Sequence, residues 1–174
     1  MKTSFIVLGA ALLIAPAAAG AQEISDAQIA HIVVTANQVD IDAGELAAAR
    51  AANSEVKAFG ELMASDHAGV NKSAANLAAK LGVTPQPNPT SKSLETAGTK
   101  NVARLKTLSG AAFDKAYIDN EVAYHQQVLD ALDTTLVPGA SNGELKALLV
   151  KVRPAFVAHL EHAKKIQGQL AAGN

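Results

Sequence analysis

Residues 54–82 read SEVKAFGELMASDHAGVNKSAANLAAKLG, and this stretch decides the fold class. Its apolar residues recur with the 3.6-residue period of a helix that buries one face; they are Val56, Phe59, Met63, Val70, Ala74, Leu77 and Leu81. Gly82 follows at the usual helix end, because glycine adopts the left-handed conformation of a C-terminal cap without strain. The stretch therefore predicts a helix over residues 54–81, with Asp66 and His67 on either side of the centre of its apolar face.

Three more segments have the same apolar period and predict long helices. They span residues 25–51, 112–136 and 142–170. Ser25 with Gln28, and Ser141 with Glu144, have the spacing of a capping box, in which the first side chain and the third helical side chain cap each other's backbone N–H groups. Pro154 lies inside the last helix and should kink it, because proline has no N–H and its ring clashes with the preceding turn.

The connections between these helices predict the topology. Residues 83–91 contain Pro85, Pro87 and Pro89 and predict a stiff, extended connector, which a shorter helix over residues 93–108 follows. Pro138-Gly139 should end the third long helix. Because the other connections are short, neighbouring long helices should be antiparallel. The sequence predicts an all-α fold, a four-helix bundle with one long crossover that carries the extra helix.

A short motif occurs at the start of two of the predicted helices. Asn53-Ser-Glu55-Val-Lys57-Ala58 precedes the second long helix, and Asn142-Gly-Glu144-Leu-Lys146-Ala147 precedes the fourth. Two related helical hairpins joined by a crossover would produce such a repeat.

The N-terminal segment, positions 1–21, has the pattern of a cleaved secretory signal peptide. Lys2 is followed by an apolar run over positions 5–15, and Ala19-Gly20-Ala21 is a small-x-small cleavage site. The apolar run is shorter than the ~20 residues of a membrane span. We expect residues 22–174 to form the exported domain, without a transmembrane segment, and to reside in the periplasm.

Composition excludes several classes of protein. Without Lys2 there are 14 basic and 16 acidic side chains, a net charge near −2, so no basic surface is expected for nucleic acid or anionic lipid. The chain has no cysteine, which excludes thiolate nucleophiles and cysteine-based metal sites. The protein partner and the oligomeric state stay open, an oligomer being possible.

Polar residues on the apolar helix faces are the candidate functional residues. By helical angle and by height along the helices, three imidazoles and up to three carboxylates should meet near the bundle axis. They are Asp40, Asp66, His67, Glu121, His125 and His159. Asp114 is instead expected near the start of the third long helix, where its charge would favour the helix dipole.

Two explanations fit this polar cluster, because buried charges need partners. Imidazole and carboxylate ligands suit a transition-metal ion such as zinc, copper, iron or manganese, with Asp66 as a carboxylate that orients a ligand histidine. Alternatively, the histidines and carboxylates only bond to one another and fix the packing register. A metalloenzyme would also need an open coordination position and a cavity.

The residues around the cluster resemble an exported bacterial family catalogued as domain of unknown function 4142. The resemblance covers residues 26–170 and is carried by Asp66-His67, by Leu105-x-x-Leu108-Ser-Gly-x-x-Phe113-Asp114-x-x-Tyr117, by His125 and by His159-Leu160. It implies a ferritin-like bundle and no established activity. Its recurrent positions fall on Asp40, Asp42, Asp66, His67, His125 and His159, whereas Glu121 stands where the family more often has an apolar residue.

The sequence argues against a ferritin-type di-iron centre. Such centres use Glu-x-x-His on two helices, and no Glu-x-x-His occurs in this chain. We therefore expect a periplasmic, ferritin-like protein without enzymatic turnover that binds a transition metal, in metal handling or envelope stress. The alternative is a structural or interaction protein of the cell envelope.

Overall fold

The computed structural model describes residues 24–172, and this part of the chain is helical apart from short connections, with no strand. The predicted signal peptide and its cleavage site after Ala21 lie outside the described residues. None of the helices between residues 24 and 172 combines the length and the apolar character that crossing a bilayer requires.

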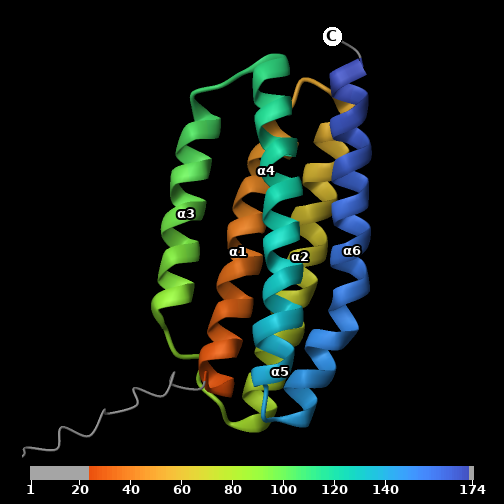
Figure 1. The fold of residues 1–174 in the computed structure, drawn as a ribbon. Helices are drawn as coiled ribbons and strands as arrows, with labels where there is room; N and C mark the ends of the chain where they lie inside the picture. The colour runs from red at the N-terminus through yellow and green to blue at the C-terminus, as the bar shows by residue number, and fades with distance from the viewer. Residues whose placement is uncertain (1–23, 173–174) are drawn as a thin grey trace, which may run out of the picture.

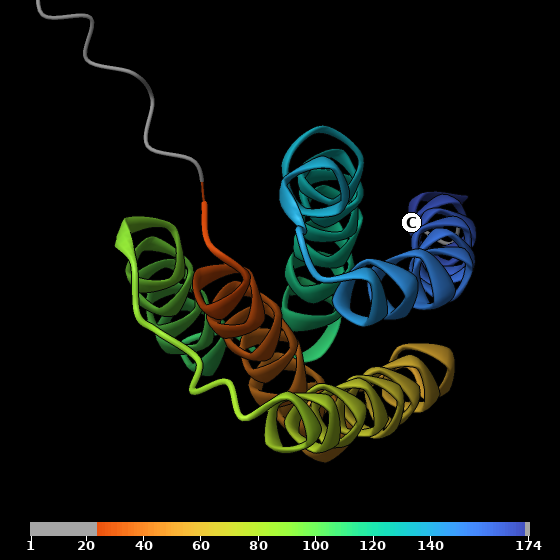
Figure 2. The ribbon, with the colours of Figure 1, turned by 90° about the horizontal axis from the view of Figure 1, so that it is seen from below.

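The long helices run side by side, and the one over residues 89–106 lies at the edge of the group (Figure 1). Figure 2 shows the same arrangement from below, with α3 beside α1 and farthest from α6. The most extensive packing is between α1 and α2, followed by the pairs α4–α6 and α1–α3. In chain order the elements are α1 (Asp26–Arg50), α2 (Ser54–Leu81), α3 (Pro89–Lys106), α4 (Gly110–Ala131), the π-helical turn η1 (Leu132–Leu136), α5 (Val137–Gly139) and α6 (Gly143–Ala172).

The ends of α1 and α2 agree with the sequence-based expectation. Ser25 Oγ accepts the backbone N–H of Gln28 at 3.3 Å, and Gln28 Oε1 accepts the backbone N–H of Ser25 at 3.1 Å, so the capping box is confirmed. Gly82 ends α2 in the left-handed conformation, which glycine adopts without strain because it has no Cβ atom.

Two other helix starts differ from the expectation. The cap of α6 is Asn142 rather than Ser141: its Oδ1 accepts the N–H groups of Glu144 and Leu145 at 2.9 and 3.1 Å. Helix α3 begins at Pro89, because proline fits the first helical position, where an N–H would have no partner. Asn88 caps this helix, so the extended connector is shorter than predicted.

The third long helix ends at Gly139, as Pro138-Gly139 predicted, but three residues beyond the expected last residue 136. It continues through the π turn and α5, and the N–H of Val137 bonds to the carbonyl of Leu132, five residues earlier. The wider turn accommodates Pro138, which has no N–H to donate. Helix α6 also passes through its proline, Pro154, and changes direction in its lower half (Figure 1).

The repeated motif marks two equivalent helix starts, each fixed by an aspartate from another helix. Asp114 accepts the backbone N–H groups of Ala52 and Asn53 at 3.0 and 2.8 Å. At the other end of the molecule, Asp26 accepts those of Ser141 and Asn142, both at 2.9 Å. Asp114 is buried and fixes the start of α2, so the expectation that it serves the dipole of its own helix was wrong.

The apolar core consists of two clusters, one on each side of a polar layer. Every long helix passes through one cluster, then the polar residues, then the other cluster. The upper core comprises Ala43, Ala47, Val56, Phe59, Met63, Leu105, Phe113, Tyr117, Ile118, Ala163 and Ile166. The lower core comprises Ile29, Ile32, Val33, Ala74, Leu129, Leu132, Leu136, Ala140, Leu145, Leu149, Phe156 and Leu160.

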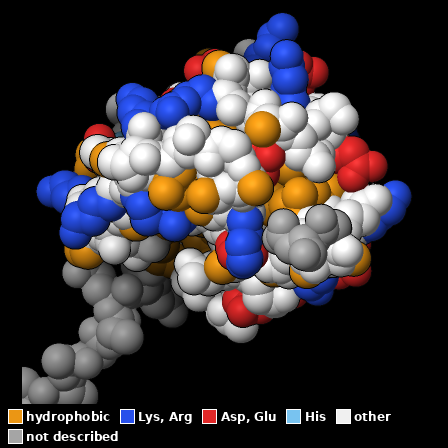
Figure 3. Space-filling view, turned by 90° about the horizontal axis from the view of Figure 1, so that it is seen from above, with side chains coloured by type: hydrophobic (Ala, Val, Ile, Leu, Met, Phe, Trp, Pro, Cys, Tyr) orange, Lys and Arg blue, Asp and Glu red, His pale blue; other side chains and the backbone are white. Residues whose placement is uncertain are grey.

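The end beyond the upper core is closed by contacts between connections. The Arg50 guanidinium donates to the carbonyls of Lys106 and Leu108 at 2.9 and 3.0 Å, which joins the end of α1 to the connection between α3 and α4. Figure 3 shows this end from above, with basic and acidic side chains distributed around apolar ones.

Helices α1 and α2 approach each other through two glycines. A Cβ atom at Gly44 would lie 2.7 Å from the carbonyl oxygen of Gly60, and a Cβ atom at Gly60 would lie 2.7 Å from that of Gly44. Both obstacles are backbone atoms, so neither position tolerates a side chain without a shift of the helices. This contact lies one turn from Asp40 and two turns from His67, and it brings those two side chains together.

Candidate metal centre

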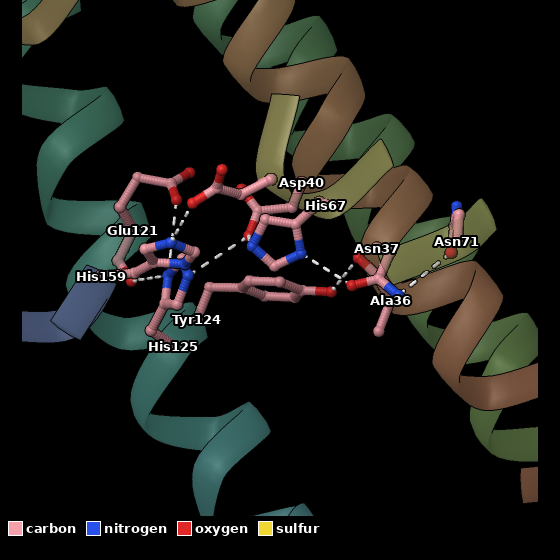
Figure 4. Close-up of polar contacts among 10 residues, drawn as sticks. Ala36, Asn37, Asp40, His67, Asn71, Glu121, Tyr124, His125 and His159 are labelled. Atoms are coloured by element: carbon pink, nitrogen blue, oxygen red, sulfur yellow. Dashed lines mark hydrogen bonds and ion pairs between the residues drawn. The ribbon is translucent and has the colours of Figure 1, made fainter. Parts of the chain in front are cut away.

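Three imidazoles from three helices converge in the polar layer (Figure 4). His67 comes from α2, His125 from α4 and His159 from α6, and their ring centroids are 5.4–5.6 Å apart. One nitrogen of each ring lies within 4.8 Å of the corresponding nitrogens of the other two. All three side chains are buried.

The outer nitrogen of each ring faces an oxygen atom that accepts a hydrogen bond. His67 Nδ1 lies 2.7 Å from Asn37 Oδ1, His125 Nδ1 lies 3.1 Å from the backbone oxygen of Glu121, and His159 Nε2 lies 2.9 Å from Asp66 Oδ2. An oxygen acceptor requires a proton on that nitrogen. In the neutral ring the other nitrogen then carries a lone pair.

The inner nitrogens carry those lone pairs, and they have no hydrogen-bond partner. They are His67 Nε2, His125 Nε2 and His159 Nδ1, each without exposed surface. Three buried acceptors that face one another without a donor between them are unusual in a folded protein. The three rings are close enough together that they could hold a metal ion.

A chain of side-chain amides fixes the tautomer of His67. Asn37 Nδ2 donates to Asn71 Oδ1 at 3.0 Å, and Asn71 Nδ2 donates to the carbonyl of Val34 at 3.4 Å. The backbone oxygen at the end of the chain can only accept, so it determines the orientation of both amides. Asn37 Oδ1 is therefore left to accept from His67.

Two carboxylates complete the layer. Asp40 Oδ2 lies 3.0 Å from His67 Nε2 and 3.5 Å from His125 Nε2, outside the direction of a hydrogen bond to either ring. Glu121 Oε2 lies 3.5 Å from His125 Nδ1. Asp40, Glu121 and His125 also offer three ligand atoms within 4.8 Å of one another. No oxygen of either carboxylate has a hydrogen-bond partner.

Burial favours the neutral form of two of the three imidazoles, those of His125 and His159. Burial lowers the pKa of His125 to about 4 and also lowers the pKa of His159. Burial and the neighbouring charge of Asp40 raise the pKa of Glu121 well above its ordinary value. Burial alone would raise the pKa of Asp40, but His67 and His125 outweigh it, so its pKa is lowered. Asp40 is thus the ionised carboxylate of the pair.

The structure brings five of the six predicted residues together inside the protein. Asp40 is fully buried rather than at the margin of its helix face. Asp66 is the exception: its side chain is 44% exposed, and it bonds to the outer nitrogen of His159 from the protein surface. Asp66 therefore orients a ring, as one of the sequence hypotheses had it, and does not reach the inner nitrogens.

Two further residues of the site are absent from the sequence-based set. Asn37 holds His67, and Tyr124 donates from its hydroxyl to the carbonyl of Ala36 at 2.8 Å, which joins α4 to α1 beside the site. Asn37 lies three residues before Asp40, one helical turn away on the same face. That spacing was the available signal, and it was overlooked because amides were not counted among candidate ligands.

A comparison with curated proteins and with solved structures finds no match. The family described as domain of unknown function DUF4142 matches residues 12–166, which is most of the chain and includes all the residues of the polar layer. The resemblance stated from the sequence is thereby confirmed, and the chain belongs to the DUF4142 family.

Proposed function

We propose that this protein binds one transition-metal ion in its polar layer, with His67, His125 and His159 as nitrogen ligands and Asp40 as a carboxylate ligand. The observation that carries the proposal is the set of three unpartnered inner nitrogens, each with its proton held on the opposite side of the ring. Glu121 supplies a second carboxylate beside His125.

The energetic argument concerns the metal-free state. A buried polar atom without a partner costs about 1–3 kcal/mol, and the layer has several such atoms. A divalent cation converts the lone pairs into coordination bonds and neutralises the buried Asp40 carboxylate. Three imidazoles with a carboxylate suit zinc, copper, iron or manganese better than calcium or magnesium, which prefer oxygen ligands.

The alternative of a purely structural polar layer explains the outer contacts and the 3.0 Å approach of Asp40 to His67. The bonds to Asn37, Glu121 and Asp66 would also fix packing in the absence of a metal. This alternative leaves the inner nitrogens of His125 and His159 without a partner, and side chains that only fix the packing register do not need such atoms. The geometry therefore favours the metal-binding function.

We further propose a setting for this function. The pattern of residues 1–21 supports export, with cleavage after Ala21 and residence in the periplasm. The side-by-side arrangement of α1, α2, α4 and α6, with α3 in the long connection, supports a ferritin-like four-helix bundle. A single buried ion suits metal handling or envelope stress better than catalytic turnover.

Metal titration tests the proposal. The purified protein is stripped with a chelator and titrated separately with Zn²⁺, Cu²⁺ and Mn²⁺ by calorimetry, and elemental analysis follows. The wild type should bind one ion per chain, and the double variant His67→Ala/His125→Ala none. The matched control is His31→Ala, because His31 is half-buried and its ring, among the described residues, hydrogen-bonds only to Thr35.

A thermal melt gives an independent readout. An ion at 100 times its Kd should stabilise the folded wild type by about 2.7 kcal/mol. The His31→Ala control should gain as much, and the double variant nothing. Circular dichroism shows whether the double variant is folded; a folded double variant that still binds one ion would refute the site.

A further inference from the structure

An apolar cavity of about 230 Å³ lies directly beside the polar layer, on the side of the lower core. Its walls come mainly from α1, α4, η1 and α6, with side chains such as Ile32, Val128, Leu149 and Val152. Among the described residues, no acidic or basic side chain other than His67 lines it. Close packing normally fills such a space, so the cavity requires an explanation.

The cavity coincides with the two irregular helix segments of the molecule. Leu132, Thr135 and Leu136 of the π turn line it, and Val152 and Phe156 flank Pro154 in α6 and line it from the other side. A proline inside a helix is destabilising, and π turns are frequent at functional sites. Both irregularities therefore lie in the cavity wall.

The shape of the cavity is elongated. Along α4 and η1 its lining runs from Tyr124 to Leu136, which is more than three turns of helix. Its inner end is formed by the rings of His67 and Phe156, which stack at 5.0 Å between centroids. The other end carries the exposed side chains of Thr90 and Thr135.

We propose that this cavity binds a single unbranched hydrocarbon chain, with the chain inside and an uncharged or zwitterionic polar head at Thr90 and Thr135. The apolar lining excludes a charged ligand from the interior, and the length along α4 favours a chain over a compact ring. For scale, an apolar cavity of ~150 Å³ holds benzene, and this cavity is larger.

The bound chain would abut the metal site, because His67 belongs to both. Its far end would lie against the His67 and Phe156 rings and cover the polar layer from the lower side. This coupling rests on the proposed metal binding, whereas chain binding itself does not. The two proposals can therefore fail separately.

A homologous series of ligands tests the cavity. The protein, purified in the processed form that cells produce, is titrated by calorimetry with linear alcohols from hexanol to dodecanol, in chelated and metal-loaded states. Each buried methylene should tighten binding about fourfold until the cavity is full, and longer chains should gain nothing. A parallel titration with a ten-carbon lysophosphatidylcholine shows whether the cavity accepts a chain with a zwitterionic lipid head.

Matched variants of one helix locate the binding. Ala131→Leu places a larger side chain in the cavity wall and should weaken decanol binding about tenfold or more. Ala123→Leu makes the same substitution at an exposed position of α4 outside the cavity. It should change the affinity for decanol less than twofold. Both variants should keep the metal stoichiometry of the wild type.

The outcomes separate the two proposals. Decanol binding to chelated protein that metal does not alter, with no ion bound, would uphold the cavity and reject the metal site. One ion per chain with no binding of any alcohol would reject the cavity alone. Equal weakening by the two leucine variants, or binding of toluene without binding of decanol, would also overturn the hydrocarbon-chain assignment.

Discussion

The upper and lower cores differ in how completely they are packed. Every residue of the upper core is at most 2% exposed, whereas most residues of the lower core are 5–8% exposed. Half of the lower core lines the cavity, and none of the upper core does. The helices are regular through the upper core, while the π turn and Pro154 lie in the lower half.

This difference indicates that the two halves have different roles. The upper core holds the helices in place through close contacts, among them the Gly44–Gly60 approach next to it and the Arg50 contacts at its end. The lower core is packed less closely and leaves a cavity beside the polar layer. The polar layer lies at the boundary, so it packs against the closely packed core on one side and borders the cavity on the other.

The largest expected effect compares one leucine from each core. Leu105→Ala in the upper core should lower the free energy of unfolding by about 4 kcal/mol, because its side chain is surrounded on all sides. Leu132→Ala should cost roughly half as much, because Leu132 already borders the cavity and loses fewer contacts. Urea unfolding measures both; equal losses would show that the two cores are packed alike.

The pH dependence of the stability of the metal-free protein tests the polar layer between the two cores. Below about pH 6.5 the unfolded chain protonates His125, whereas the folded chain does so only near pH 4, the value to which burial lowers its pKa. The unfolded state thus binds more protons in this window, and stability falls with falling pH, by about 3 kcal/mol from this residue. His159, whose pKa is also lowered, adds in the same direction.

Glu121 opposes this trend and must be removed to expose it. Its folded pKa is raised, so its contribution to stability is present below about pH 4.5 and lost as pH rises. The free energy of unfolding should therefore fall more steeply with falling pH in Glu121→Gln than in the wild type. Adding His125→Gln to this variant should remove most of the pH dependence. Urea titrations in chelator from pH 4 to 7 measure this, and a flat profile in Glu121→Gln would contradict it.

Next in size is the pair of aspartates that fix the helix starts. Asp114→Ala at the upper end should cost about 3 kcal/mol, because Asp114 itself is buried and its loss leaves two partly buried N–H groups without their charged acceptor. Asp26→Ala at the lower end should cost about 1 kcal/mol, because Asp26 is only half-buried and water can replace it. Thermal unfolding compares the two variants. A larger loss for Asp26→Ala would contradict the closer packing of the upper half.

The smallest expected effect concerns the ion pair that joins the two irregular segments. The Arg153 guanidinium donates twice to the Asp133 carboxylate, with both distances 2.7 Å, and so joins η1 to α6 at the surface. Exposed pairs contribute little. Asp133→Asn should shift the urea midpoint less than either substitution above, and the shift should vanish in concentrated salt. A large shift would mean that the pair holds the cavity walls together.

Most of the fold could be predicted from the sequence, because apolar period and helix caps are local signals. The bounds of α2 and the capping box of α1 follow from them. The failures occurred where a local signal had two interpretations. Pro89 was interpreted as part of a connector but starts α3, and Pro138 was placed beyond the helix, whereas a π turn carries the helix through it to Gly139.

The candidate site was predictable as a set of residues but not as a geometry. Helical angle and height brought His67, His125 and His159 to one depth, which the distances bear out. Their role as metal ligands stays a prediction. Which nitrogen of His67 faces inward depends on Asn37 and Asn71, which belong to different helices, and no pattern within one helix reveals the contact between them. The cavity likewise depends on how three helices diverge.

The contact between Gly44 and Gly60 acts as a fixed pivot for the centre. It joins backbone to backbone, so no rotamer can absorb a small error in the crossing of α1 and α2. Asp40 and His67 stand one and two turns from this pivot, and any rotation about it changes their 3.0 Å separation directly. In the proposed centre, the choice among metal ions of different radius is therefore governed by two residues that have no side chain and never touch the ion.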